Sequence, residues 1–425
     1  MALLRVLDLS KSFFGVPVLE GVDFELEAGE VLGLVGENGA GKSTVMKIVG
    51  GVHLPDSGSI ELDGTTLRLG RPLDAERAGI ATAYRSMALN LWPGGIVPDL
   101  SVIAGRSPDA VAEAATRYGF AAYTTDWHDL VNDPAIQVFD NVGPDETHVE
   151  PTRAAIAAGK AVICEKPLSW SALEANELAA AAEAAGVRSL TCFNYRFVPA
   201  VRLTRDLVRS GELGEIFTAS FRYAQEWRTD SDSWLPTKSG ALNVIGCHAI
   251  DLGHFILGDI ADVSGVITAP VTDASRGEPV DTVTGLARFA AGAVGTIGAT
   301  LIAPGRRNHL TFEISGSKGT VYWDLENLNN LMMFRRDGSA VNGFAQEIVC
   351  EAHHEIAKDW WPTGHILGWE HSHINMLAHF LRAVAEGTEV GPDAATFRDG
   401  ARAADVAQAI TASAESGHRT PAVYG

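Results

Sequence analysis

Hydrophobic residues in the first 95 positions follow the pattern of short strands joined by turns. Apolar runs at 3–7, 22–26 and 30–35 are separated by Gly, Asp and Pro residues, which commonly end strands. From about residue 100 onward, strand-like runs alternate with Ala-rich helical segments, a pattern typical of a parallel sheet with crossover helices. The pattern therefore predicts a change of architecture near residue 95.

Three strand-and-helix units are predicted in succession after this change. Their strands lie at 101–104, 137–141 and 161–164. Their helices have recognisable start and stop residues, including a capping box that begins at Ser171. The residues that begin or end these helices are Ser107, Pro108, Gly119, Gly159, Ser171 and Gly186.

Beyond residue 260 hydrophobic and polar residues alternate with a period of two. Such alternation predicts an antiparallel sheet with one face toward solvent. The alternating runs lie at 282–289, 293–302, 310–315 and 320–324. Near the C-terminus, helical spacing predicts an amphipathic helix with one apolar face, made of Ile374, Leu377, Leu381 and Val384.

The amino-acid composition predicts a globular protein, and the chain length predicts more than one domain. The chain has 425 residues, which at roughly 150 residues per domain gives two to three domains. Its formal net charge of −20 repels phosphate backbones and anionic lipids, so we expect neither nucleic acid nor a membrane surface as a partner. The four cysteines show no CxxC spacing and are too few to cross-link the chain, which predicts reduced thiols in a cytoplasmic protein.

The N-terminal sequence and the apolar runs also predict no secretion signal and no membrane insertion. Arg5 and Asp8 fall where a signal peptide would have its apolar core. No apolar run reaches the roughly 18 residues that a spanning helix needs.

The segment 36–43 has the sequence GENGAGKS, which fits the phosphate-binding pattern GxxxxGK[ST]. It follows an apolar strand and precedes a helical run, the context that this loop requires. Glycines let successive backbone N–H groups converge on phosphate oxygens at a helix N-terminus. We expect Lys42 to reach the β- and γ-phosphates and the Ser43 hydroxyl to bind Mg²⁺ when ATP is present. We predict no other metal site.

Together with segments 9–13, 55–58 and 62–64, this loop makes residues 1–92 resemble the first third of an ATP-binding cassette subunit from a sugar importer. The resemblance implies that Phe13 stacks on adenine. It also implies an ATP site made of Gly36, Asn38, Gly39, Gly41, Lys42, Ser43 and Thr44. Arg85 stands where the family has its γ-phosphate-sensing glutamine, and no LSGGQ signature follows. The resemblance therefore implies ATP binding without transport-coupled hydrolysis.

From Ser101 to its end the chain resembles the Gfo/Idh/MocA oxidoreductases. The matching segments are 102–108, 157–167, 193–196, 211–216 and 246–252. The resemblance implies hydride transfer between NAD(P) and a sugar or polyol. It also implies a homo-oligomer that assembles through the antiparallel sheet.

The resemblance puts the catalytic roles on Lys166 and His248. Lys166 follows a predicted buried strand, at the sheet edge where ligands bind, and is implied to contact the substrate hydroxyl and the cofactor ribose. His248 is implied to be the general base, since imidazole titrates near neutral pH. The alternatives are a solvated lysine and a core histidine. Val244 stands where the family commonly has Asp, which implies reduced activity.

The resemblance also implies the remaining residues of the cofactor and substrate sites. Arg106 and Ser107 would face the adenosine ribose, and an Arg there favours NADP over NAD. The other implied cofactor residues are Pro144, Asp145, His148, Glu165 and Pro167, and the implied substrate residues are Tyr195, Arg196, Asp251 and His365. The GxGxxG loop that opens such folds is missing from the sequence; cassette sequence ending near Trp92 occupies its place.

These observations predict a hybrid chain of combined α/β and α+β class. Residues 1–95 would be a truncated cassette segment with a P-loop, residues 96–190 an incomplete doubly wound, Rossmann-like parallel sheet, and residues 191–425 a substrate and oligomerisation domain with a large antiparallel sheet. We expect an NAD(P)-dependent dehydrogenase of sugars or polyols. The alternatives are an ATP-binding protein of sugar transport with a dehydrogenase-like scaffold, and a product without activity.

Overall fold

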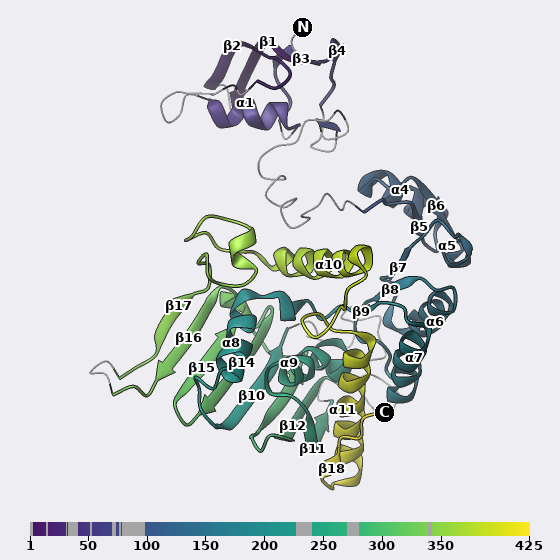
Figure 1. The fold of residues 1–425 in the computed structure, drawn as a ribbon, viewed down its shortest axis with the longest axis vertical. Helices are drawn as coiled ribbons and strands as arrows, with labels where there is room; N and C mark the ends of the chain where they lie inside the picture. Colours follow the sequence, from purple (N-terminus) through teal and green to yellow (C-terminus); the bar gives the residue numbers. More distant parts are fainter. Residues whose placement is uncertain are drawn as a thin grey trace. The chain divides into compact units, whose positions relative to one another are not determined.

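The chain divides into two units in a computed structural model, one from Met1 to Asn90 and one from Leu91 to Gly425 (Figure 1). Each unit has its own hydrophobic core. The structure describes residues 3–13, 16–30, 32, 41–51, 53–69, 74–75, 78, 98–226, 240–269, 280–338 and 342–425.

The first unit contains an antiparallel sheet and a short helix. The strands β1 (Leu4–Phe13), β2 (Val16–Leu26), β3 (Ser57–Leu62) and β4 (Thr65–Thr66) lie in the order β2-β1-β3-β4, and helix α1 spans Lys42–Val49. Val6, Leu9 and Ile48 are fully buried in their common core. The predicted strands at 3–7 and 22–26 are confirmed, whereas most of 30–35 lies outside the described residues.

The second unit begins with short parallel strands that alternate with helices, so the three predicted strand-and-helix units are confirmed. The strands are β5 (Val102–Ala104), β6 (Ala122–Thr124), β7 (Val138–Asn141), β8 (Ala161–Cys164) and β9 (Ser189–Thr191). The helical segments are α4 (Pro108–Tyr118), α5 (Trp127–Asn132), η1 (Asp145–Thr147), α6 (Val149–Ala157) and α7 (Ala172–Ala185).

Local capping chemistry sets the helix ends where the sequence predicts them. The Ser107 Oγ accepts a hydrogen bond from the Ala110 N–H at 3.4 Å, and the Ser171 Oγ accepts one from the Glu174 N–H at 3.3 Å. The capping box at Ser171 is only half formed, because the Glu174 carboxylate accepts the Ser169 hydroxyl at 2.8 Å instead. One satisfied backbone N–H is therefore enough to fix this helix start.

The parallel strands form two sheets rather than one. β5 pairs with β6, and β7, β8 and β9 pair in that order. In a doubly wound sheet of order 3-2-1-4-5-6, the first strand lies between the second and the fourth. The strand that carries GxGxxG is missing from the sequence, and among the described residues no strand lies between β5 and β7 as it would in such a sheet. The described part of the sheet divides at this position (Figure 1).

The rest of the second unit is built on a nine-stranded sheet of order β17-β16-β15-β14-β10-β13-β12-β11-β18. Its strands are β10 (Ile216–Ala224), β11 (Ile260–Thr268), β12 (Thr282–Phe289), β13 (Val294–Thr300), β14 (His309–Gly316), β15 (Gly319–Asp324), β16 (Asn330–Arg335), β17 (Ala345–Ile348) and β18 (Thr420–Pro421). The predicted antiparallel sheet is in fact mixed, because β10 and β13 run parallel. The chain between β10 and β13 passes through helix α9, so the two strands can run in the same direction. The alternation of hydrophobic and polar residues within one strand gives no sign of this pairing.

Helices cover one face of this sheet, and none of the helices described here lies over the other (Figure 1). The covering helices are α8 (Pro199–Arg209), α9 (Cys247–Leu257) and α11 (Phe397–Ser416). Buried and exposed residues alternate along β12, as expected for a strand with one covered face. Shorter helical segments are η2 (Asn194–Phe197), the π-helical turn η3 (Leu242–Gly246), η5 (Leu325–Asn327) and η6 (Ala357–Asp359).

The predicted C-terminal amphipathic helix is α10 (Trp369–Glu386), but its buried face differs from the predicted one. Its fully buried residues are Ser372, Asn375, Met376, Ala378, Phe380 and Ala383. The predicted face of Ile374, Leu377, Leu381 and Val384 is only half-buried. The buried face thus combines the large apolar Met376 and Phe380 with small and polar residues, a mixture that the hydrophobic spacing alone does not indicate.

Two further observations concern the described parts of the chain. All four cysteines are buried and carry free thiols. None of the helices described here has the length and apolar character needed to cross a membrane.

Candidate active site

Lys166 lies directly after β8, with its ammonium group fixed on a backbone oxygen. The Lys166 Nζ donates a hydrogen bond at 2.9 Å to the carbonyl oxygen of Val244, which belongs to the π-helical turn η3. The Glu165 carboxylate accepts the Lys166 backbone N–H at 3.1 Å. The lysine therefore reaches from the parallel sheet to the turn that leads into α9.

His148 holds the loop that carries Lys166. This histidine is 1% exposed, and its Nδ1 lies 2.7 Å from the Pro167 carbonyl oxygen while its Nε2 lies 3.1 Å from that of Gly143. The imidazole thus joins the loop after β7 to the loop after β8. Although the sequence suggests a cofactor contact for His148, its ring nitrogens are directed at the protein backbone. In this structure His148 positions the turn behind Lys166.

His248 is the second residue of α9 and lies in an aromatic environment. Its ring lies with centroid distances of 5.6 Å to Phe193, 4.8 Å to Tyr195 and 5.9 Å to Tyr223. Burial holds the pKa of His248 well below its usual range, and the charge of Lys166 and the nearby His373 lower it further. The imidazole is therefore neutral near pH 7, so one of its ring nitrogens carries no proton.

Helix α10 contributes two residues that sequence reasoning missed. The rings of Trp369 and His373 make an edge-to-face contact with centroids 4.4 Å apart. Burial lowers the pKa of His373, against the opposing effect of the Glu165 charge. The four-residue spacing of Trp369 and His373 on a predicted helix was the available signal, because residues four apart lie on the same helix face.

A chain of polar side chains extends from the His248 environment toward the loop before β14. The Tyr195 and Tyr223 hydroxyl oxygens lie 2.8 Å apart, and the Trp369 Nε1–H donates to the Tyr195 hydroxyl at 3.3 Å. The Asn308 Oδ1 accepts the Tyr223 hydroxyl at 2.5 Å and the Gln225 amide at 2.7 Å. The implied substrate residue Tyr195 thus belongs to a hydrogen-bonded wall beside His248.

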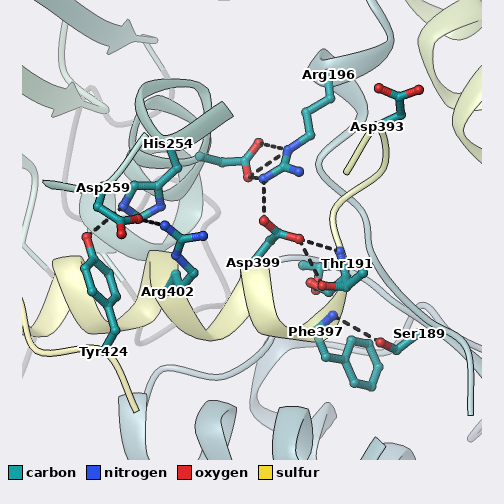
Figure 2. A network of polar contacts seen from close by, with 12 residues as sticks. Ser189, Thr191, Arg196, His254, Asp259, Asp393, Phe397, Asp399, Arg402 and Tyr424 are labelled. Carbon is teal, nitrogen blue, oxygen red and sulfur yellow. Dashed lines mark hydrogen bonds and ion pairs between the residues drawn. The ribbon is translucent and has the colours of Figure 1, made fainter. Parts of the chain in front are cut away.

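Arg196 and Asp251, the next two implied substrate residues, bind each other instead of facing a cavity. The Arg196 guanidinium donates to both Asp251 oxygens at 2.6–3.1 Å, and also to Asp399 of α11 at 3.1 Å (Figure 2). Both partners are about 2% exposed. Burial alone would lower the pKa of Arg196, but the two carboxylates outweigh burial and raise it. Their role in this structure is to hold η2 against α9 and α11.

The remaining implied residues lie at the surface or on loop turns. His365 is exposed, and its Nδ1 lies 2.9 Å from the Pro362 carbonyl oxygen. The Asp145 carboxylate accepts the Trp170 indole N–H at 3.1 Å, and Pro144 precedes it as the N-cap of η1. Arg106 and Ser107 follow β5, with Ser107 as the N-cap of α4. Pro144, Asp145, Arg106 and Ser107 lie at the end of a strand or next to a helix start, whereas no described contact joins His365 to Lys166 or His248.

The P-loop is described only at its C-terminal end. Gly41 has a φ of +80° and accepts the Thr44 and Val45 N–H groups at 2.9 and 3.0 Å, so it begins helix α1. Gly36, Asn38 and Gly39 lie outside the described residues, and of Lys42 and Ser43 only the helical backbone is described. Thr44 is half-buried. The Phe13 ring contacts His53 edge-to-face at 5.2 Å.

One group of side chains within the described ranges could in principle hold a metal ion, and it lies elsewhere. Ligand atoms of His309, Asp324 and Glu326 lie within 4.8 Å of one another. However, the Glu326 carboxylate already accepts hydrogen bonds from Arg306 and from the backbone N–H groups of Arg307 and Asn308. We assign this group to holding the turn that presents Asn308.

Comparisons with known proteins connect this geometry to a family. The GFO/IDH/MocA C-terminal domain model matches residues 201–322. Levoglucosan dehydrogenase of Pseudarthrobacter phenanthrenivorans is 34% identical over 361 residues, covering 78% of this chain and 92% of that protein. The chain belongs to the Gfo/Idh/MocA oxidoreductase family. Crystal structures agree: levoglucosan dehydrogenase in complex with NADH and levoglucosan has a TM-score of 0.76 at 33% identity, covering 81% of this chain and 95% of that one.

A further solved structure and a second family complete the comparison. An oxidoreductase domain protein from Kribbella flavida is 35% identical with a TM-score of 0.73, covering 81% of this chain and 97% of that one. The ABC transporter model matches residues 19–142. A ribose import ATP-binding protein of Rubrobacter xylanophilus is 48% identical over 104 residues, which is 24% of this chain and 20% of that protein. The Gfo/Idh/MocA chain thus carries a segment similar to about a fifth of an importer ATP-binding subunit.

The residues of this Gfo/Idh/MocA chain fit a nicotinamide dinucleotide at its two ends. Arg106 and Ser107 follow β5, where an adenosine ribose binds in a doubly wound sheet, and Lys166 follows β8. The division of the sheet between β5 and β7 coincides with the missing glycine-rich loop, whose backbone N–H groups bind the pyrophosphate.

Proposed function

We propose that this protein is an NAD(P)-dependent dehydrogenase that oxidises a hydroxyl group of a sugar or polyol. The proposal is carried by two observations. The Lys166 ammonium lies on the turn η3 that runs into α9, and the buried His248 of α9 lies beside an aromatic wall, with its pKa lowered by burial and by the Lys166 charge. In the proposed reaction, the carbinol O–H proton passes to His248 while the carbinol C–H leaves as hydride. The nicotinamide supplies the acceptor for that hydride when it is bound.

Lys166 and His248 would have separate roles at the substrate hydroxyl group. The ammonium group donates a hydrogen bond to the oxygen and stabilises the negative charge that develops as the proton leaves. The imidazole, with its pKa lowered by burial, takes the proton without first having to lose one. The rings of Tyr195 and Tyr223 exclude water on the far side of His248.

The similarity to levoglucosan dehydrogenase makes levoglucosan the first substrate to test. We expect the full chain to reduce NAD⁺ or NADP⁺ in its presence, at a rate that Lys166→Met and His248→Asn each lower by about 10²- to 10⁴-fold. The matched controls are Lys358→Met and His353→Asn, since both of these side chains are exposed. Loss of activity in the control variants, or full activity without Lys166, would contradict the assignment.

Cofactor choice is part of the same proposal. Arg106 at the end of β5 supports a preference for the 2′-phosphate of NADP, while the relatives of known structure include complexes with NADH. Parallel titrations with NADH and NADPH, followed by nicotinamide fluorescence, test this point. Tighter NADPH binding that Arg106→Ala abolishes would support it, and equal affinity would overturn it.

The open face of the nine-stranded sheet supports a homo-oligomer. Leu286 and Val294 are 63% and 50% exposed on neighbouring strands of this sheet. Both residues line a shallow hollow, together with Thr218, Ser220, Ser264, Arg288, Thr296 and Arg419. Exposed apolar residues on a flat sheet face, bordered by charged groups, are typical of a subunit interface. The four free, buried cysteines support a reducing compartment such as the cytoplasm.

A second candidate function is ATP binding by the P-loop segment. It is supported by the left-handed Gly41 that begins α1 and by the similarity to ribose import ATP-binding proteins. Titration with ATP and Mg²⁺ tests it, with Lys42→Ala as the variant that should abolish binding. Saturable ATP binding together with no nicotinamide binding would favour the dehydrogenase-like part as a scaffold.

A further inference from the structure

The π-helical turn η3 connects the position of Lys166 to the helix that carries His248. η3 spans Leu242–Gly246 and runs directly into α9, whose second residue is His248. Its Val244 carbonyl oxygen accepts the Lys166 ammonium at 2.9 Å, across 78 positions of sequence. One short stretch of backbone therefore fixes the relative position of a lysine from the parallel sheet and a histidine from the sheet domain.

The turn is held firmly enough to serve this purpose. Leu242 and Ile245 are 4% exposed, and the Ala241 N–H just before the turn donates to the Val280 carbonyl at 2.9 Å. A Cβ at Gly246 would lie 3.2 Å from the Ala299 Cβ of β13 and 3.1 Å from Leu242. The turn thus packs closely on the sheet, and its carbonyl has little freedom to move.

The side chain of Val244 cannot itself bind an ammonium group, because it has no acceptor atom. It is half-buried and packs on the hydrophobic core of the domain. The interaction with Lys166 therefore depends on where the backbone lies and not on which side chain stands at position 244. π-helical turns are rare insertions in α-helices, and they occur often at functional sites.

We propose that the Val244 carbonyl oxygen of the π-helical turn η3 positions the Lys166 ammonium group for catalysis. A neutral backbone oxygen then holds the lysine in place, and no charged side chain is needed for this role. The inference rests on the proposed dehydrogenase function for its catalytic part. The positioning part concerns only the Lys166 ammonium and can be measured without turnover.

The carbonyl can be weakened without changing any side chain. Replacing Ile245 with its α-hydroxy acid converts the Val244–Ile245 amide into an ester, whose carbonyl is a poorer hydrogen-bond acceptor. The same replacement at Ile250, which is fully buried in α9, removes a comparable helical amide away from Lys166 and is the matched control. Val244→Ala is a second comparison, because it keeps the backbone.

Two readouts separate positioning from folding. In the full chain, we expect the ester at Ile245 to raise the labelling rate of Lys166 by an amine-reactive acylating reagent at least fivefold, as followed by mass spectrometry. We also expect it to lower kcat at least tenfold with little change in KM for the sugar. The ester at Ile250 and Val244→Ala should leave the Lys166 labelling rate within about twofold of that of the unmodified protein.

The outcomes are distinct. Unchanged Lys166 labelling in the Ile245 ester would overturn the positioning role, whatever the activity. A raised labelling rate in both esters would also overturn it, because helix weakening alone would then explain the effect. Failure of the proposed function would instead be seen as no turnover by the unmodified protein, and the labelling comparison would still decide the role of the carbonyl.

Discussion

Asp399 of α11 accepts a hydrogen bond from Arg196 of η2 at 3.1 Å, although the two residues are separated by 203 positions. Arg196 follows Tyr195, whose ring contacts His248. Asp399 also accepts the Thr396 N–H and hydroxyl, both at 2.9 Å. The C-terminal helix thereby fixes the segment that forms one wall of the site (Figure 2).

We predict that Asp399→Asn destabilises the protein by about 1–3 kcal/mol at pH 7, because it removes a charged partner from a buried guanidinium. Burial alone would raise the pKa of Asp399, but Arg196 and the Thr396 hydrogen bonds outweigh burial and lower it. A carboxyl whose pKa is lower in the folded state stabilises above its unfolded pKa, and that stability is lost as the pH falls. The difference between the two proteins in urea unfolding should therefore shrink below about pH 4. Glu415→Gln, on an exposed residue of the same helix, should cost little at any pH.

A second prediction concerns Gly400, where α11 touches the loop that carries Lys166. A Cβ at this position would lie 2.6 Å from the Thr191 Oγ1 and 3.1 Å from the Leu168 Cβ. We expect Gly400→Ala to lower stability by about 1–3 kcal/mol through overpacking and to lower kcat, since Leu168 is two residues from Lys166. Gly253→Ala is the control, because its Cβ would meet Phe289 at an ordinary 3.5 Å. Equal thermal stability of Gly400→Ala and Gly253→Ala would contradict this prediction, because it would show that α11 can shift to accommodate the added Cβ without loss of stability.

The third prediction follows from the division of the parallel sheet. Without a glycine-rich loop between β5 and β7, the pyrophosphate loses its backbone N–H contacts. We expect NADH to bind at least tenfold more weakly than it does to levoglucosan dehydrogenase, a difference of about 1.4 kcal/mol. Fluorescence titration of both proteins side by side measures this, with excess ATP added to keep the P-loop segment from contributing. Equal affinities would mean that another segment supplies the missing contacts.

The fourth prediction is a pH profile. Burial, the charge of Lys166 and the nearby His373 lower the pKa of His248, so this base stays neutral as the pH falls. Between pH 8 and 6 we expect kcat/KM to remain constant, whereas a base with the ordinary pKa near 6.5 would lose roughly three quarters of its active form at pH 6. In an NMR titration, Lys166→Met should raise the pKa of His248. An unchanged pKa of His248 in Lys166→Met would contradict this prediction, because it would show that the Lys166 charge is too far away to affect the imidazole.

The fifth prediction tests the open sheet face. Leu286→Glu combined with Val294→Glu should convert the oligomer to monomers in light-scattering measurements, because two charges would be buried at the interface. Leu173→Glu is the control, since this α7 residue is 69% exposed and lies away from the sheet. A monomeric unmodified protein would contradict the predicted assembly at the outset.

Local features of this fold could be predicted from the sequence, and distant pairings could not. Ser107 and Ser171 fix helix starts within four residues of themselves, so their roles follow from the sequence around them. Arg196 and Asp251 were assigned to substrate by resemblance, but their burial depends on Asp399, which the sequence gives no reason to place beside them. The parallel pairing of β10 with β13 likewise leaves no trace in the alternation of either strand.

The same distinction applies to the candidate site. Lys166 is implied by the resemblance, and its place after a buried strand agrees with that; the structure brings its ammonium group to the turn before His248. His373 was missed in favour of His365, although both lie in the same C-terminal segment. His365 lies before α10 in an exposed turn, whereas His373 lies four residues after Trp369 on the helix itself. Where α10 begins, and which of its faces packs on the rest of the fold, decides between them, and both depend on tertiary packing.

A strand removed from the middle of a sheet takes two rows of backbone hydrogen bonds with it, whereas an edge strand takes only one. In this protein the residues for the adenosine end follow β5 and those for the nicotinamide end follow β8, and no ladder joins these sheets among the described residues. The spacing between the two halves of the cofactor surface is then set by the single connecting segment through α5. A dinucleotide that contacts both sets of residues would span the two sheets, so we expect its binding to fix the spacing between them.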